Sequence, residues 1–114
     1  MELKQSLSLI ASLPGVIGSL IVGLDGTPVA NELPEEYDPD SVGSLSLGMY
    51  INASKTLRKM AHDRLHVLIA RSDFGYLAIV LVEEEGKLLI TLSSEQTTDE
   101  LVKLMRSIMK LLAV

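Results

Sequence analysis

The sequence predicts a single α/β domain in which helices cover both faces of a central antiparallel sheet. Three segments carry apolar residues at helical spacing and five shorter segments are strand-like, in the order α-β-β-α-β-β-β-α. Short turns join the last three strand-like segments, which indicates an antiparallel meander. These segments are apolar at nearly every position, so both faces of the sheet need a cover. A chain of 114 residues fits one domain, residues 1–114.

The first helix is expected over residues 2–13, where Leu3, Leu7 and Ile10 share one face. Pro14 and Gly15 then end it, because proline and glycine follow helix C-termini. Residues 18–24 are strand-like and lead into the next turn.

Asp25 and Gly26 form the dipeptide that most strongly indicates a β-hairpin. The returning strand, residues 27–32, contains Pro28. Proline cannot donate a hydrogen bond to a neighbouring strand, so this strand is expected at an edge of the sheet.

A long helix is expected over residues 40–60, with Asp38, Asp40 or Ser41 as its N-cap and Pro39 in its first turn. It carries two apolar stripes where an ordinary surface helix has one. The first stripe, expected on the chain's own sheet, is Val42, Leu45, Met49, Ala53, Leu57 and Met60. The second stripe is Leu47, Tyr50, Ile51 and Ser54. The residues leave two interpretations of this second stripe open, a deeper core or a second chain.

The meander is expected over residues 65–70, 76–82 and 87–93, and the last helix begins near Thr98 and Asp99. Five strands and three helices fit an antiparallel sheet with both terminal helices on one face and the long helix on the other. The residues alone do not decide whether the third or the fifth strand forms the edge opposite residues 27–32.

Composition excludes several classes of protein. The chain has no cysteine, which removes disulfides, thiolate metal sites and cysteine nucleophiles. Three Tyr, one Phe and no Trp leave few rings on which bases could stack, and the net charge of −5 argues against nucleic acid and anionic membranes. The N-terminus lacks a signal-peptide pattern and no apolar run is long enough to span a bilayer, so a cytoplasmic protein is expected.

No motif for catalysis, cofactor binding or metal binding is present. His62 and His66 have the i, i+4 spacing of a helical zinc pair, but they fall in a turn and a strand and do not share a face. Neither glycine-rich nucleotide motif occurs, and neither histidine lies in a triad pattern. We expect no catalytic residues, no cofactor, no metal and no enzymatic activity of its own.

Two charged clusters flank the long helix. The basic cluster lies near its C-terminal end and is Lys55, Arg58, Lys59, His62 and Arg64. Two interpretations are open: the cluster complements the helix dipole, or it docks an acidic surface. Under the second interpretation, the residues that dock a partner are Lys55, Arg58, Lys59 and Arg64. The acidic residues at the helix start, Glu35, Glu36, Asp38 and Asp40, complement the other end of the dipole in the same way.

The order of elements and several segments resemble the Roadblock/dynein light chain family over essentially the whole chain. The segments are Leu-Pro-Gly-Val at 13–16, Gly-Ser-Leu-Ile-Val-Gly-Leu-Asp-Gly-Thr-Pro-Val-Ala at 18–30, a long helix rich in small residues, and Phe-Gly-Tyr-Leu at 74–77. The resemblance implies a profilin-like three-layer α/β/α sandwich with strand order 2-1-5-4-3.

The resemblance also implies a homodimer, or a heterodimer with a related chain, in which third strands pair edge to edge and middle helices pack together. The implied interface is Ser44, Leu47, Tyr50, Ile51, Ser54, Leu65, His66, Val67, Leu68, Ile69 and Ala70. Small residues at 43, 44 and 54 would let the two helices approach. An independent argument agrees, because residues 65–70 contain no proline, lysine or glutamate to protect an exposed edge.

Such proteins are non-catalytic modules for small Ras-like GTPases, and some stimulate GTP hydrolysis. The resemblance therefore implies a homodimeric regulator or scaffold that binds such a GTPase, without assigning an arginine finger to any residue. Two alternatives are a small-molecule sensor of profilin-like fold and a self-assembling structural protein that uses its sheet edge.

Overall fold

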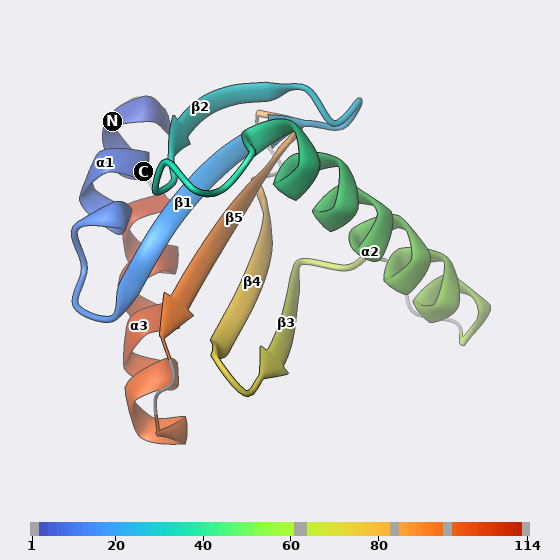
Figure 1. Cartoon of the computed structure of the whole chain (residues 1–114). Helices are drawn as coiled ribbons and strands as arrows, with labels where there is room; N and C mark the ends of the chain where they lie inside the picture. The colour runs from blue at the N-terminus through green and yellow to red at the C-terminus, as the bar shows by residue number, and fades with distance from the viewer. Residues whose placement is uncertain (1–2, 61–63, 83–84, 95–96, 113–114) are drawn as a thin grey trace.

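The protein is a three-layer α/β/α sandwich, as expected (Figure 1). The computed structural model describes residues 3–60, 64–82, 85–94 and 97–112. Helices α1 (Leu3–Ala11) and α3 (Thr98–Leu112) cover one face of the sheet, and α2 (Pro39–Lys59) lies on the other. The strands are β1 (Val16–Gly23), β2 (Pro28–Glu32), β3 (Val67–Ser72), β4 (Gly75–Val82) and β5 (Lys87–Ser94).

The strand order is β2-β1-β5-β4-β3 and every pairing is antiparallel, which confirms the expected topology. Strand β2, which begins at Pro28, lies at one edge as its proline predicts. Strand β3 lies at the opposite edge, so the question that the residues left open is answered. The hairpin turn is also confirmed: Gly26 has a φ of +86° and the N–H of Thr27 donates to a carboxylate oxygen of Asp25 at 3.0 Å.

Two apolar cores lie on opposite faces of the sheet. Beneath α1 and α3 the fully packed residues are Leu7, Ile10, Ile21, Val80, Leu89, Leu104 and Ile108. Beneath α2 they are Leu20, Val22, Ile79, Leu88 and Ile90. Both cores consist of aliphatic side chains, as the composition requires.

Helix α2 begins where expected but turns a different face to the sheet. Asp38 is its N-cap, with Asp40 N–H donating to the Asp38 side chain at 3.3 Å, and Pro39 occupies the first turn. The assignment of the two stripes is wrong in part. Leu45, Met49 and Met60 were expected on the sheet and are exposed, whereas Leu47 and Tyr50 were expected to face a second chain and pack on the core beneath α2.

Close contact at Gly43 explains this orientation. A Cβ at Gly43 would lie 2.8 Å from Cγ1 of Val22 and 3.3 Å from the carbonyl oxygen of Gly26. Gly43 and Ser46 are the buried residues of α2, so small side chains mark its line of contact with β1. Gly43 therefore lets α2 approach its own sheet, and the expectation that it faces a partner helix is wrong.

Strand β3 is displaced by two residues from the expected 65–70. Leu65 is buried and its carbonyl oxygen accepts a hydrogen bond from the Tyr50 hydroxyl, so Leu65 is anchored to α2 before the strand begins. At the other end, Arg71 and Ser72 continue the pairing with Tyr76 and Gly75. These polar residues lie beyond the expected strand end, yet they belong to the ladder of a tight hairpin.

We expect Gly43→Ala to destabilise the fold by about 1–3 kcal/mol, because the added methyl group meets the fully buried Val22 side chain. Gly48→Ala is the matched control, since a Cβ there meets no atom within 4 Å. It should stabilise the protein by about 0.5–1 kcal/mol through helix propensity. Urea unfolding at one fixed protein concentration measures both changes. Equal effects of the two substitutions would show that α2 does not rest on β1 at Gly43.

Candidate interaction surface

Helix α2 covers only part of its face of the sheet. Its buried residues, Gly43 and Ser46, are both in its first half, and none of the residues from Ile51 to Lys59 is buried. Beyond its contacts with β1, the helix extends past the β3 edge and away from the sheet (Figure 1). The C-terminal half of α2 is therefore an arm with little of its own chain beneath it.

Large apolar side chains are exposed on this arm and also on the first half of α2. Leu45 is 72 % exposed and Met60 is 63 % exposed, and Met49 and Ile51 are exposed as well. Clustered apolar area in water marks interaction sites in soluble proteins, because burial of each Å² contributes about 25 cal/mol. The surplus apolar surface of α2 thus exists in the folded chain, although part of it lies on residues other than those expected.

The free edge of β3 is open for pairing over its whole length. The N–H of Leu81 donates to the carbonyl oxygen of His66 at 2.9 Å, and this bond shows which residues of β3 turn their backbone groups toward β4. Every second residue then turns its backbone groups outward, which gives Val67, Ile69 and Arg71. The Ile69 side chain is exposed too. Within β3 no proline or acidic residue blocks this edge, so its outward groups suit a further strand.

A hydrogen bond holds α2 and this edge together. The Tyr50 hydroxyl donates to the carbonyl oxygen of Leu65 at 2.9 Å, two residues before β3 begins. The Tyr50 ring packs on the core beneath α2. The exposed helix face and the open strand edge are therefore presented as one surface.

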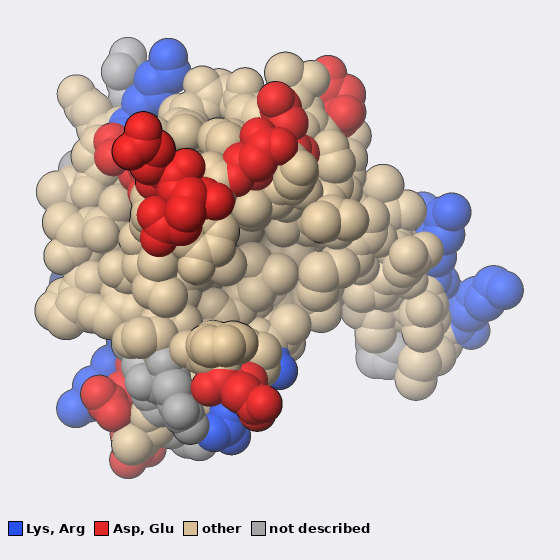
Figure 2. All heavy atoms as spheres, in the orientation of Figure 1, with Lys and Arg blue, Asp and Glu red and all other residues tan. Residues whose placement is uncertain are grey.

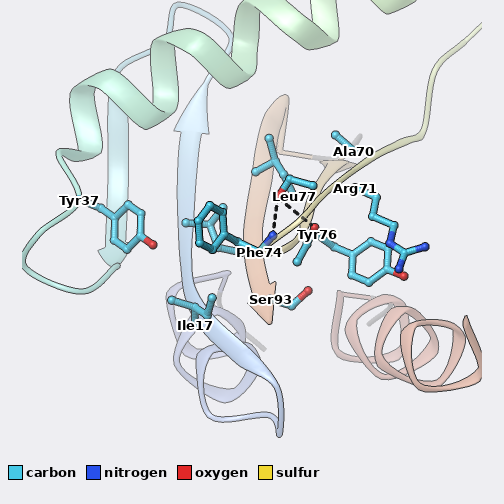
Figure 3. Close-up of a pocket in the computed structure, with 11 residues that line it drawn as sticks. Ile17, Tyr37, Ala70, Arg71, Phe74, Tyr76, Leu77 and Ser93 are labelled. Carbon is cyan, nitrogen blue, oxygen red and sulfur yellow. Dashed lines mark hydrogen bonds between the residues drawn. The ribbon is translucent and has the colours of Figure 1, made fainter. Parts of the chain in front are cut away.

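A groove of about 260 Å³ lies at the end of the sheet that α2 leaves uncovered. Figure 3 shows the side chains of Ile17, Tyr37, Phe74 and Leu77 gathered around it. Phe74, the one phenylalanine of the chain, is 88 % exposed in the two-residue turn between β3 and β4. The groove is lined mainly by apolar side chains, so it suits another apolar surface better than a polar ligand.

The polar part of the groove lies toward α3. There the Arg71 guanidinium stands 5.8 Å from the centre of the Tyr76 ring, within cation–π range (Figure 3). Arg71 and Tyr76 are cross-strand partners, so this contact stiffens the β3–β4 hairpin.

Charge is divided between the two ends of α2. Figure 2 shows basic side chains at the tip of the arm and acidic ones over the segment that precedes the helix. The basic residues Lys55, Arg58 and Lys59 lie in the last two turns of α2, with Arg64 after it. All four are exposed.

The structure brings some of the expected interface residues to the surface and places others in the interior. Ile51, His66 and Ile69 are exposed, and Val67, Leu68, Ala70 and Ser54 are half-buried. Ser44 is exposed beside the Gly26 turn, and Leu65 is buried. Leu47 and Tyr50 pack against their own sheet.

Sequence reasoning missed the exposure of Leu45, Met49, Met60 and Phe74. A signal existed for Phe74, because a large ring in a two-residue turn between strands has no layer of the fold to cover it. A signal for burial existed at Gly43 and Ser46, because small residues permit a close contact between a helix and a sheet.

Within the described residues no cluster of three metal-ligating side chains occurs, and no helix is long and apolar enough to cross a membrane. His62, part of the histidine pair considered above, lies outside the described residues.

The most prominent surface features of this small α/β/α domain are an open strand edge and an apolar helix arm. The model of one family, the Roadblock/LC7 domain, matches residues 2–94. The chain belongs to this Roadblock/LC7 family, as its resemblance implied. Members are generally regulatory and without catalytic activity of their own. A search of curated proteins found no match.

Solved structures share the fold at low sequence identity. A Roadblock/LC7 domain from Streptomyces avermitilis is 15% identical, with 98% of this chain and 92% of that chain covered and a TM-score of 0.80. MglB from Myxococcus xanthus is 13% identical, with coverages of 96% and 80% and a TM-score of 0.85. An MglB structure described as having a tetrameric arrangement is 17% identical, with coverages of 95% and 83% and a TM-score of 0.77.

We expect Tyr50→Phe to loosen the start of the β3 edge, because it removes the hydroxyl that donates to the Leu65 carbonyl. The cost in unfolding free energy should be about 1 kcal/mol, and amide hydrogen exchange should accelerate at Leu68, the first strand residue whose N–H faces β4. Tyr37→Phe, in a ring at the surface, is the control and should change neither. Unchanged exchange at Leu68 in the Tyr50 variant would show that this bond does not anchor the edge.

Proposed function

We propose that the protein is a homodimeric regulatory or scaffold module that binds a small Ras-like GTPase in the cytoplasm. The single observation that carries the dimer is the open β3 edge beside the exposed face of α2. Membership of the Roadblock/LC7 family, and structural likeness to MglB, support a regulatory or scaffold role. The tetrameric arrangement described for one MglB structure also favours self-association as a property to test.

In the proposed dimer, the two β3 strands pair antiparallel across a two-fold axis and the two α2 helices pack beside each other. Backbone groups of Val67, Ile69 and Arg71 would supply the hydrogen bonds. Ile51 and Ser54, which the sequence suggested, would be joined by Leu45, Met49 and Met60, whose exposure the fold reveals. Six strand residues form a small contact, whereas stable interfaces bury about 1,200–2,000 Å², so the helix is needed.

The GTPase part of the proposal rests on the family and assigns no catalytic residue to this chain. We propose that the exposed basic end of α2, with Arg64, contacts an acidic surface, either on the GTPase or on the second copy of the chain. Stimulation of GTP hydrolysis is the stronger form of the proposal, and nucleotide-independent scaffolding is the weaker form.

The dimer is tested by Ile69→Lys, which would place two like charges opposite each other near the two-fold axis. We expect dissociation to a folded monomer at micromolar concentration in sedimentation-velocity runs, with an unchanged circular dichroism spectrum. Val67→Pro should do the same, because it removes an outward N–H and leaves the bonds to β4 intact.

Val29→Lys on β2 is the matched control, because Val29 is 42 % exposed and Ile69 is 41 % exposed, on opposite edges of one sheet. The control should remain dimeric. A wild-type protein that is strictly monomeric, or an Ile69→Lys variant that dimerises as tightly as the wild type, contradicts the proposed dimer.

GTPase binding is tested with purified small Ras-like GTPases of the source organism, each loaded with GDP or a non-hydrolysable GTP analogue. We expect at least one to bind the wild-type dimer and to bind Ile69→Lys more weakly in biosensor measurements. Faster phosphate release in the presence of the dimer supports the activator form. Equal affinity for both nucleotide states supports the scaffold form, and the absence of binding to every candidate contradicts the proposal.

A further inference from the structure

The free end of α2 is both apolar and basic. Met60 is 63 % exposed and Leu57 is half-buried, so both offer apolar area beyond the sheet that α2 rests on. Lys55, Arg58 and Lys59 accompany them within the last two turns. This helix end therefore fits a site that combines an apolar floor with negative charge.

The groove beside Phe74 has those two properties. Its floor includes Leu77 and Leu92, and Phe74 and Ile17 stand exposed at its mouth (Figure 3). Tyr37, a further lining residue, lies in the acidic segment that contains Glu35, Glu36 and Asp38. Glu35 and Glu36 are exposed, so negative charge accompanies Tyr37 at the groove.

The fold places the helix end and the groove where a two-fold axis can join them. Gly43 of α2 contacts Val22, near the end of β1, whereas the groove includes Ile17, near its start. The groove and α2 therefore occupy opposite ends of the same face. The lining residue Leu77 packs with the core beneath α2, which identifies that face.

Antiparallel pairing of two β3 strands needs a two-fold axis perpendicular to the sheet. Such an axis keeps α2 of both copies on the same face and exchanges the two ends of the sheet. An arm that leaves its own sheet across the β3 edge then runs over the end of the partner's sheet that the partner's α2 leaves bare (Figure 1). Residues 51–59 make the arm about 14 Å long, which is about three strand spacings, so the arm can cross the partner's β3 and β4 toward the groove.

We propose that the groove of each copy receives the C-terminal end of α2 from the other copy, with Met60 and Leu57 against the apolar floor and Lys55, Arg58 and Lys59 near Glu35 and Glu36. This inference rests on the dimer under Proposed function and names the acidic surface that the basic end of α2 meets. Each dimer contains the contact twice, because a two-fold interface is self-complementary. The groove is then a part of the interface, and the open β3 edge is the other part.

A charge exchange tests the contact. Variant A is Lys55→Glu/Arg58→Glu/Lys59→Glu and variant B is Glu35→Lys/Glu36→Lys. Each variant alone brings like charges together twice, so we expect its homodimer to be at least tenfold weaker than the wild type at low salt. In a mixture of A and B, both contacts in the mixed dimer again join opposite charges. The mixed dimer should therefore exceed the statistical half of all dimers in native mass spectrometry, and high salt should reduce the excess.

The matched control is Lys103→Glu/Arg106→Glu/Lys110→Glu on α3, which makes the same charge change on exposed residues of the opposite layer. It should dimerise like the wild type and form no excess of mixed dimers with B. Variants A and B that each dimerise as tightly as the wild type, and mix statistically, overturn the inference while the dimer stands. A strictly monomeric wild type overturns the proposed dimer itself, and this inference with it.

The apolar part of the contact is tested by Phe74→Ser. Because Phe74 is 88 % exposed in the single chain, its loss should leave the unfolding free energy of a monomeric Ile69→Lys background unchanged. In the wild-type background it should weaken the dimer at least tenfold. A Phe74→Ser variant with unchanged dimerisation but lost GTPase binding would assign the groove to the GTPase and overturn the inference.

Discussion

The close approach of α2 to β1 at Gly43 is the constraint on which the exposed surface depends. No Cβ fits between this backbone and Val22, so the helix is held near its N-terminal end and turned about its axis to a definite angle. That angle places Leu47 and Tyr50 over the core and leaves Leu45 and Met49 in water. It also directs the rest of the helix away from the sheet.

The bond from Tyr50 to Leu65 extends this constraint to the sheet edge. The segment between α2 and β3 is short, and the bond holds its final residues against the helix. A shift of α2 would therefore displace the first residues of β3. The helix arm and the bare end of the sheet are two results of one packing arrangement, and the edge is tied to it by this bond.

Much of the architecture follows from local sequence, because caps, turns and strand patterns are properties of adjacent residues. Asp38 with Pro39, and Asp25 with Gly26, predicted a helix start and a hairpin that the structure confirms. Strand order depends on distant pairings, and it came from family resemblance and not from the residues alone.

The face that α2 turns to its sheet could not be predicted from apolar periodicity. Two stripes about a third of a turn apart satisfy a helical pattern equally well, and the choice between them is made by the fit at one glycine. A buried glycine and a buried serine contribute nothing to an apolar stripe, although they mark the closest contact. The groove could not be predicted for a related reason. It lies where α2 leaves the sheet uncovered, and the angle of α2 decides where that is.

The exposed face of α2 has a chemical consequence of its own. Two of its large apolar side chains, Met49 and Met60, carry thioether sulfur in water, in a chain without cysteine. Oxidation of a thioether to the sulfoxide adds a polar oxygen to an otherwise apolar side chain, and reductases can reverse it. The fully packed core is built from leucine, isoleucine and valine, which do not undergo this reaction. Oxidants would therefore lower the affinity of this helix face for apolar surfaces, while the fold beneath it is preserved.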